Sequence, residues 1–480
     1  MGFAATRVIY RLVGVRFDGA RLGTTLQFID PQLLREDLVS SLWHLHYQPP
    51  LYNLYLGLVL KASGDDGTTI FHATYLLAGL ALALALYALM CRLGVRAGWS
   101  AAIALGFAAS PAIVLYENWL YVEYLVAAAL TLSAVLLHRF AAGAGAGNAV
   151  AAFWLLGGIV LSRTLFHLVW LVGIAGIVVL LLPGRRREVL LAAIVPVALC
   201  AAVYGKNLVQ QGSFSASTCT GVNLYDISTN ELSPSERAHL VARGELSRFA
   251  LLNPNFLPRR LVRGGRPTGV RLLDEPVKST GAPNLNATGY KGPCRRYAAD
   301  ARTVIRRHPR AYATGVANAV LIFLRPSSDY KYLDRDNVRE VKGPERVMAA
   351  AVMGQFERTP VTLDLEKNLR AIGWFILLGY GAAVAIAVGT LATARRGRTW
   401  DAPAALVAAL FLATFAWVTL AGTLFDVGEN NRFRFPVDPL ALAVLAGGVA
   451  RHLSRRAGAH GSVAAAPDGP SVRPPADVGP

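Results

Sequence analysis

The chain has 480 residues, of which 54% are hydrophobic and only 16% are charged, and its mean hydropathy is +0.40. This composition excludes an ordinary soluble globular protein, because too few charged residues are present to cover a water-exposed surface. The formal net charge of +18 is compatible with nucleic-acid binding. The basic residues cluster at the ends of apolar runs, however, where anionic lipid headgroups and the positive-inside bias account for them. We therefore expect membrane lipid, and not nucleic acid, as a partner.

The amino-terminal residues 1–17 form a short apolar run that contains three arginines, which is poor material for a complete span. We interpret this run as the end of a first transmembrane helix, which is either shortened and supported by its neighbours or preceded by further sequence. Residues 18–69 then form the first external loop. Its apolar stretch Leu51 to Leu60 is too short to cross a membrane and predicts a loop of helices that lie against the membrane surface.

Long apolar runs predict transmembrane helices two to seven within residues 70–204 and helices eight to ten within residues 371–452. Arginines mark every second boundary between these runs, and the positive-inside bias places those boundaries in the cytoplasm. The boundaries in between are therefore external. The sequence predicts an all-α polytopic membrane protein with about ten transmembrane helices. The arginines that mark the cytoplasmic boundaries are Arg92, Arg96, Arg139, Arg185, Arg186, Arg187, Arg395 and Arg451.

Residues 205–370 are less apolar and rich in Pro, Gly, Asn and Arg, which predicts a large external loop or small domain. Within it, Arg302 to Leu324 has helical spacing with a basic first half and an apolar second half, as is typical of an interfacial helix. Cys219 and Cys294 also lie here, and in an oxidising compartment they either pair or remain two unrelated thiols. The tail, residues 453–480, lacks periodicity and predicts a disordered cytoplasmic segment.

The first external loop contains FIDPQLLREDLVSSLWHLHYQPPLYNLYLG, with Asp-Pro-x-Leu-Leu starting at Asp30 and Gln-Pro-Pro-Leu-Tyr starting at Gln48. This pattern resembles bacterial glycosyltransferases of the C superfold (GT-C), which include protein O-mannosyltransferases and the lipid A aminoarabinose transferase. The segments YENWLYVEY, LSRTLFH and DVGENNRFRFPVDP are similar to the same superfold. The chain departs from the family pattern where the acidic dipeptide is Asp30-Pro31 and where Gln48 replaces a lysine.

The resemblance implies a GT-C-like helix bundle in a bacterial plasma membrane, with its active site on the extracytoplasmic face. It also implies transfer of one sugar, with inversion, from a polyprenyl-phosphate donor to a glycan, lipid or protein acceptor. Such a transfer needs a carboxylate that takes the proton of the acceptor hydroxyl. Asp30 is the first candidate, although Asp followed by Pro is also a favoured start of a helix. Asp18 is the second candidate.

Glu117 and Glu123 lie six residues apart at a predicted external boundary, where carboxylates without partners are destabilising. They either face the substrate cavity as catalytic residues, alone or around a divalent metal with Asp30, or pair with arginines such as Arg163 to lock helices together. The chain has no CxxC pair, no HExxH and no P-loop. We therefore expect no cofactor and no metal site of those types, while the question of a divalent metal stays open.

The phosphate of a lipid donor calls for cations at the external interface. Arg432 and Arg434 fit this role, and their spacing predicts that one meets the phosphate while the other pairs with Asp426 or Glu429. Alternatively, both extend to headgroups as ordinary interfacial residues. Further candidates for the phosphate are His46, Gln48 and Lys206, although His46 also fits a structural role and Lys206 an interface anchor. The remaining predicted cavity residues are Arg163, His167, Asn207 and Glu429.

Two rival functions follow from the same residues. A transporter of lipid-linked glycans also requires charges within the membrane, and a catalytically inactive GT-C-like subunit keeps the fold without the reaction. A transporter predicts charges spread through the midplane and broken helices in paired halves. Here the candidate charges collect at one predicted face, which favours an enzyme.

Overall fold

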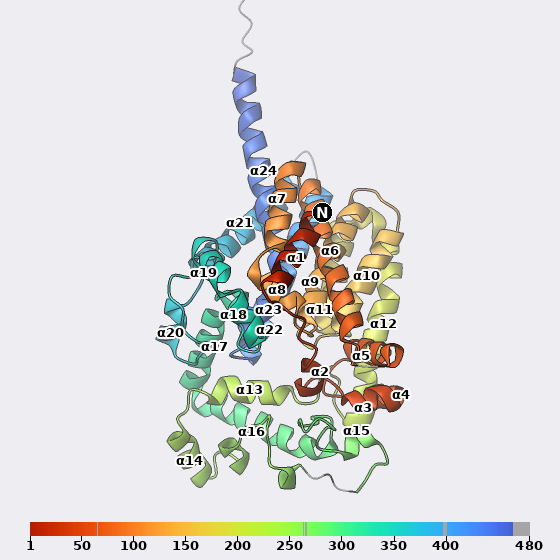
Figure 1. The fold of residues 1–480 in the computed structure, drawn as a ribbon. Coiled ribbons are helices and arrows are strands. Elements are labelled where there is room, and N and C mark those ends of the chain that lie inside the picture. Colours follow the sequence, from red (N-terminus) through yellow and green to blue (C-terminus); the bar gives the residue numbers. More distant parts are fainter. Residues whose placement is uncertain (65, 263, 265, 397–400, 464–480) are drawn as a thin grey trace, which may run out of the picture.

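The computed structural model describes residues 1–64, 66–262, 264, 266–396 and 401–463. In these residues all regular secondary structure is helical, and β-pairing is limited to two isolated bridges. The prediction of an all-α protein is therefore confirmed for the described part of the chain. Figure 1 shows a bundle of long helices with a layer of shorter helices at one end.

Six described segments are long and apolar enough to cross a membrane, and the bent pair α7 and α8 raises the number to seven if it counts as one span. The pair bends by 59° next to Pro111, because proline fits the first turn of a new helix and removes a hydrogen bond from the old one. The segments are α6 (Thr68–Arg92), α7 (Ala97–Ala108) with α8 (Pro111–Glu117), α9 (Glu123–Ala141), η1 with α12 (Pro183–Gln211), Trp374–Thr393 of α21 (Trp374–Arg396), α22 (Ala402–Phe425) and Asn430–Ser454.

The predicted number of about ten spans is not confirmed. Three predicted spans are short helices: α1 (Gly2–Leu12), α10 (Gly147–Val160) and α11 (Leu168–Leu181). The apolar run at the start of α11 is shortened because residues 162–167 form turns and His167 accepts a hydrogen bond from the amide of Val169 as the helix cap. Hydropathy alone counts such turn residues as part of a span.

The long helices pack side by side in a bundle. Helix α9 contacts α6, α10 and α22, and α21 contacts α22 and α24 (Asp438–Val463). Their outward side chains are apolar, as on α12 (Arg186–Gln211), where Leu190, Leu191 and Ile194 are each about 60% exposed. A surface of this kind is stable in lipid and not in water. The chain is thus an α-helical protein with a bundle suited to a membrane.

The first predicted external loop folds into short helices at the same end of the bundle as the large loop (Figure 1). The predicted apolar stretch Leu51 to Leu60 lies within α5 (Pro50–Ser63), which packs against α3 and α4. We call this end of the bundle the loop-side end. The other helices of this loop are α2 (Arg21–Thr24), α3 (Pro31–Glu36) and α4 (Leu38–His44).

The large loop has a small core of its own, in which α13 packs against α16. The single helix predicted for Arg302 to Leu324 is wrong: α16 ends at Arg307 and α17 begins at Pro309, because a residue before proline avoids the helical conformation. The helices of this region are α13 (Thr220–Thr229), α14 (Pro234–Ala242), η2 (Arg248–Leu251), η3 (Arg259–Leu261), α15 (Arg271–Asp274), η4 (Thr288–Tyr290), α16 (Lys291–Arg307), α17 (Pro309–Phe323), η5 (Ser327–Asp329), α18 (Arg335–Glu340), α19 (Lys342–Ala351) and α20 (Leu365–Arg370).

Two predictions about this region and the tail have an outcome. Cys219 and Cys294 form a disulfide that joins the start of α13 to α16. Of the two alternatives for these cysteines, the paired one is therefore correct. The carboxyl-terminal helix α24 runs to Val463, so the first part of the tail predicted to be disordered is helical. The remainder of that prediction, residues 464–480, lies outside the described residues.

Candidate functional site

Three of the motif segments meet at the buried carboxylate of Glu123, the first residue of α9. Its Oε1 atom lies 3.1 Å from Nη2 of Arg163, in the turn after α10, and 3.0 Å from Nε of Arg432, in α23 (Asn430–Arg434). The three side chains are 3%, 7% and 3% exposed. Arg432 also forms an ion pair with Glu429. We call Glu123, Arg163, Glu429 and Arg432 the Glu123 cluster.

Aromatic rings enclose the cluster. The guanidinium carbon of Arg432 lies 4.9 Å from the ring centres of Tyr121 and Tyr330, and its Nη1 donates a 2.7 Å hydrogen bond to the Tyr330 hydroxyl. Trp119 stacks on Tyr121 with 4.5 Å between ring centres. Cation–π contacts of this kind hold a guanidinium in a fixed orientation where water is excluded. Tyr330 was missed from the sequence, because it lies in a loop without a recognisable motif.

Several polar atoms of this region are buried without a hydrogen bond of good geometry to any described residue. Apart from the atoms already held in ion pairs, they include Oε2 of Glu123, Nε of Arg163 and Nε1 of Trp119. Buried polar groups in folded proteins are nearly always satisfied, so each exception calls for an explanation. Three such side chains at one place leave contacts that a hydroxyl, an anion or water could complete.

A narrow crevice of about 10 Å³ lies beside the cluster and contains Gln48 together with Arg163. The Pro-Pro turn after Gln48 is held there because the amide of Leu51 donates a 2.8 Å hydrogen bond to the carbonyl of Leu161. A predicted donor contact, Gln48, and a predicted cavity residue, Arg163, are thus brought together. The crevice has room for about one water molecule and not for a sugar. Its other lining residues are Gln27, Phe28, Pro49, Tyr52, Asn53, Tyr121, Val122 and Ser162.

The first candidate base, Asp30, is placed as a helix cap. Its carboxylate accepts hydrogen bonds from the amide of Gln32 at 3.0 Å, from the amide of Ser279 at 2.6 Å and from the Ser279 hydroxyl at 2.5 Å. Only 4% of the residue is exposed. Asp30 therefore starts α3 and joins the first loop to the large loop, with both carboxylate oxygens in hydrogen bonds.

The second candidate base, Asp18, has fewer partners. Its carboxylate forms a 2.8 Å ion pair with Arg21, and its backbone amide donates a 2.8 Å hydrogen bond to the carbonyl of Asn118. A β-bridge pairs Asp18 with Trp119, whose ring belongs to the aromatic wall of the cluster. The backbone of Asp18 is thus joined to Trp119, whose ring stacks on Tyr121 beside Arg432.

Glu117 belongs to a separate network, although it lies only six residues from Glu123. Two nitrogens of Arg7 contact its carboxylate at 2.8 and 2.5 Å, and the Tyr124 hydroxyl donates to it at 2.7 Å. Glu117 is completely buried and locks α1 to α8. Of the two alternatives for the acidic pair, Glu117 therefore takes the structural one.

Arg434 is likewise fully engaged inside the protein. It pairs with Asp438 at 3.0 Å and donates hydrogen bonds to the carbonyls of Phe323 and Arg325 and to the Ser327 hydroxyl. Arg432 pairs with Glu429, one of the two partners predicted for one of these arginines. Neither arginine extends to the surface, since each is at most 3% exposed. The alternative that both extend to headgroups is therefore wrong.

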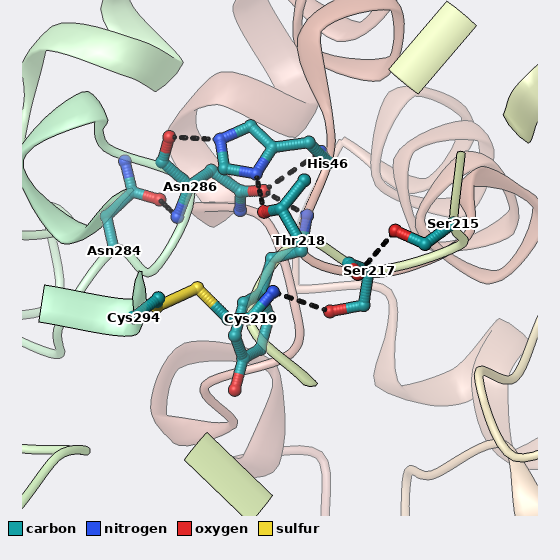
Figure 2. The surroundings of a disulfide bond; sticks show 9 residues. His46, Ser215, Ser217, Thr218, Cys219, Asn284, Asn286 and Cys294 are labelled. Atoms are coloured by element: carbon teal, nitrogen blue, oxygen red, sulfur yellow. Dashed lines mark hydrogen bonds between the residues drawn. A yellow bond between two sulfur atoms is a disulfide. The ribbon is translucent and has the colours of Figure 1, made fainter. Parts of the chain in front are cut away.

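His46 connects the two loops (Figure 2) and is not among the residues that line the crevice. Its Nε2 lies 2.9 Å from the carbonyl oxygen of Asn286, which can only accept, so Nε2 carries the proton and Nδ1 accepts from the Thr218 hydroxyl at 2.7 Å. Burial lowers the pKa of His46 to about 4. Thr218 precedes Cys219, so the disulfide and His46 fix the same junction.

Three other predicted residues lie away from the cluster in structural contacts. Lys206 donates a 2.6 Å hydrogen bond to the carbonyl of Leu45, and Asn207 donates one of 2.7 Å to the carbonyl of Ser215. His167 caps α11 and lies edge-on to Tyr204, with 4.9 Å between ring centres. Lys206 therefore has a structural role, in which it holds the first loop through Leu45.

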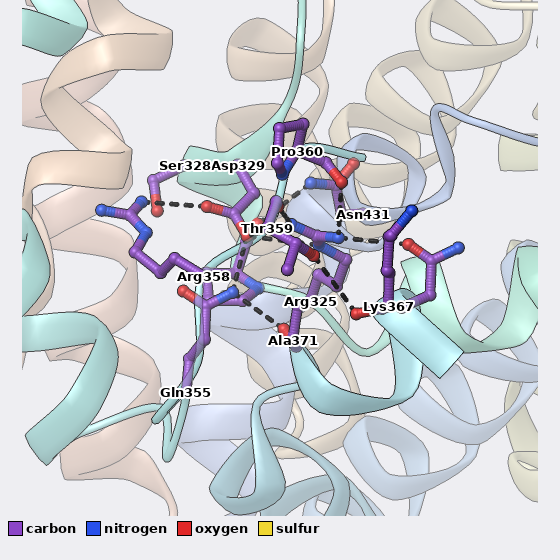
Figure 3. A network of polar contacts seen from close by, with 12 residues as sticks. Arg325, Ser328, Asp329, Gln355, Arg358, Thr359, Pro360, Lys367, Ala371 and Asn431 are labelled. Atoms are coloured by element: carbon purple, nitrogen blue, oxygen red, sulfur yellow. Dashed lines mark hydrogen bonds and ion pairs between the residues drawn. The ribbon is translucent and has the colours of Figure 1, made fainter. Parts of the chain in front are cut away.

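An ion network holds the turn that carries Tyr330 (Figure 3). Asp329, in η5, forms ion pairs of 3.0 Å with Arg325 and 2.9 Å with Arg358, and Arg325 also donates to the carbonyl of Thr359. The Gln355 amide donates to the same carboxylate at 2.6 Å. Because Tyr330 follows directly, this network fixes the hydroxyl that contacts Arg432.

Two further acids, Asp426 and Asp226, lie near Glu429. Asp426 accepts a 2.7 Å hydrogen bond from the Asn223 side chain, and burial together with nearby Glu429 raises its pKa above the usual range. Burial also raises the pKa of Asp226 to about 7. Within the described residues, no group of three or more His, Cys, Asp or Glu side chains is arranged to hold a metal ion.

Comparison of the chain with family models, with curated proteins and with solved structures finds no match.

Proposed function

We propose that this chain is a GT-C-like glycosyltransferase of a bacterial plasma membrane, which transfers a sugar from a polyprenyl-phosphate donor to a glycan, lipid or protein acceptor outside the cytoplasm. One observation supports this proposal above the others: residues from four motif segments far apart in sequence meet at the Glu123 cluster and its crevice. Arg432 of this meeting place lies in α23, which packs against α17 of the large loop. A transporter would instead need polar groups along a path through the membrane.

The donor phosphate binds between Gln48 and Arg163 in this proposal. Arg163 has an unbonded Nε and lines the crevice, whereas Arg432 is held by Glu123, Glu429 and Tyr330. A planar guanidinium holds two phosphate oxygens in parallel, and burial strengthens the contact. Arg432 then positions Arg163 through their shared partner, Glu123. The Gln48 amide supplies a neutral donor where the related pattern has lysine.

Asp18 is the base in this proposal. The acceptor hydroxyl attacks the anomeric carbon, its proton passes to the Asp18 carboxylate, the bond from that carbon to the phosphate oxygen breaks, and polyprenyl phosphate leaves. Asp18 is favoured over Asp30 because one ion pair leaves its carboxylate able to accept a proton, while three hydrogen bonds occupy Asp30. The oxidised Cys219–Cys294 pair supports an extracytoplasmic position for the adjacent loop.

Substrate entry requires a movement. Because the crevice of about 10 Å³ admits no sugar, the segment with Gln48 and the Pro-Pro turn must separate from the end of α10 when the donor binds. The single backbone hydrogen bond between Leu51 and Leu161 is a weak restraint on that motion.

The test uses the purified full chain in liposomes with a panel of polyprenyl phosphates that carry labelled sugars, together with a membrane extract as acceptor source. We expect at least one donor to lose its label to the acceptor. A fluorescent polyprenyl phosphate in the same liposomes measures its movement between leaflets. If the label stays on every donor while the lipid moves between leaflets, the protein is a transporter and not an enzyme. If neither sugar transfer nor lipid movement is detected, the protein is an inactive subunit.

A further inference from the structure

Helix α16 presents two different faces. Cys294, Tyr297, Ala301 and Val304 are buried in the core shared with α13. Arg295, Arg302 and Arg306 are exposed and lie at intervals of seven and four residues, so they form one row on the opposite side of the helix. With a rise of about 1.5 Å per residue, the row extends over about 16 Å.

These arginines carry uncompensated charge. Among the described residues, none forms an ion pair with Arg295, Arg302 or Arg306, whereas neighbouring Arg307 pairs with Glu245. Residues 291–310 contain seven basic residues and one acidic residue. That acid, Asp300, is buried and accepts hydrogen bonds of 2.9 and 2.6 Å from the amide and hydroxyl of Ser247, so its carboxylate is already engaged inside the loop core.

The position of α16 limits what the row can contact. Helix α13 lies between α16 and α22, so α16 occupies the layer farther from the bundle (Figure 1). Packed helices are about 8–10 Å apart, which separates the row from the end of the bundle by at least one helix diameter. The disulfide between Cys219 and Cys294 fixes α16 to this layer and belongs to an oxidising compartment, where nucleic acid is not a normal ligand.

We infer that the arginine row of α16 binds an extended polyanion, a linear polymer with repeated phosphate or carboxylate groups, and that the acceptor of the proposed transfer is a polymer of this class. This inference rests on the proposed function for the acceptor role. The charge repeat along the row suits successive anionic groups of a chain. Binding beside the Cys219–Cys294 junction holds such a chain near the first loop, where His46 contacts Thr218 and Gln48 lines the crevice.

The test measures binding of fluorescent inorganic polyphosphate to the full chain in a neutral detergent. The variant R295Q/R302Q/R306Q is compared with R335Q/R339Q/R346Q, which removes three exposed arginines from α18 and α19. We expect the first variant to bind at least about tenfold more weakly. We also expect the slope of log affinity against log salt to fall by about 2, from roughly 0.7 per lost contact. The control variant should match the wild type.

Equal affinity in the α16 variant, or an equal loss in the control variant, would overturn the inference. Phosphatidylglycerol added to the micelles at the same phosphate concentration should not displace polyphosphate, and displacement would assign the row to lipid headgroups instead. The measurement uses no donor lipid, so its failure does not bear on sugar transfer. If polyphosphate binds but no sugar is transferred, the proposed function is refuted, while the arginine row remains a polyanion-binding site.

Discussion

Nε of Arg432 lies 3.0 Å from Oε1 of Glu123, and both side chains are 3% exposed. Because Arg163 shares the same oxygen, Glu123→Gln would leave two buried guanidinium groups without their common counterion. Breaking a buried ion pair by removing one partner destabilises a protein by about 3–5 kcal/mol. We therefore predict a large loss of unfolding free energy, measured by thermal unfolding in detergent. Glu366→Gln, which removes an exposed ion pair with Arg370, should change stability by less than about 1 kcal/mol. Equal effects of the two substitutions would contradict a central role for Glu123.

Arg163, the proposed phosphate ligand, and Arg434, which is engaged inside the protein, should respond differently to replacement by lysine. Arg163→Lys keeps the charge but loses the second parallel bond to phosphate, so we predict an apparent KM for the lipid donor raised about tenfold with little loss of folded protein. Arg434→Lys should instead lower the amount of folded protein, because the guanidinium of Arg434 contacts Asp438, two carbonyls and Ser327. Donor titrations and size-exclusion profiles separate the two effects. Unchanged donor dependence in Arg163→Lys would move the phosphate site elsewhere.

His46 should make stability depend on pH. Its pKa is 6.5 in the unfolded chain and about 4 in the folded protein, so between these values the unfolded chain binds more protons. Stability therefore falls as the pH falls from 6.5 to 4, and the full effect is about 3 kcal/mol. Carboxylates titrate in the same range, so the prediction concerns the difference between the wild type and His46→Gln.

Unfolding midpoints of the two proteins at pH 8 and pH 4 measure that difference. His46→Gln is expected to be less stable than the wild type at pH 8, where it loses the contacts to Thr218 and Asn286, and to lose less stability on acidification. Parallel pH profiles would show that the first loop does not depend on a neutral His46.

The disulfide should stabilise the junction of the two loops. It joins cysteines 75 residues apart, and a closed loop of that length corresponds to about 4 kcal/mol in the chain-entropy model. The variant C219A/C294A should therefore be cleaved faster by protease in the large loop, while Cys91→Ala, at a free cysteine, should behave like the wild type. Reaction of all four thiols with an alkylating reagent in the denatured, unreduced protein would contradict the pairing.

The sequence predicted the helical class and, as one of two alternatives, the ion pair between Glu123 and Arg163. It could not predict that Arg432 completes the same cluster, because the side of a helix that a residue faces depends on how the helices pack. Tyr330 and Asp226 carry no local signal, and His46 required knowledge of Thr218 and Asn286, which lie far away in the sequence. The predicted number of spans is not confirmed, because hydropathy does not detect caps such as His167 that shorten a helix.

The contrast between Asp18 and Asp30 tests the central claim most directly. With a donor identified from the labelled panel, single-turnover transfer is measured for the wild type, Asp18→Asn and Asp30→Asn, together with donor binding. We predict that Asp18→Asn lowers the rate about 10²-fold to 10⁴-fold with donor binding unchanged, whereas Asp30→Asn lowers stability by about 1 kcal/mol or more through the lost cap and Ser279 contacts. Wild-type turnover in Asp18→Asn, with turnover lost in a folded Asp30→Asn, would contradict the account.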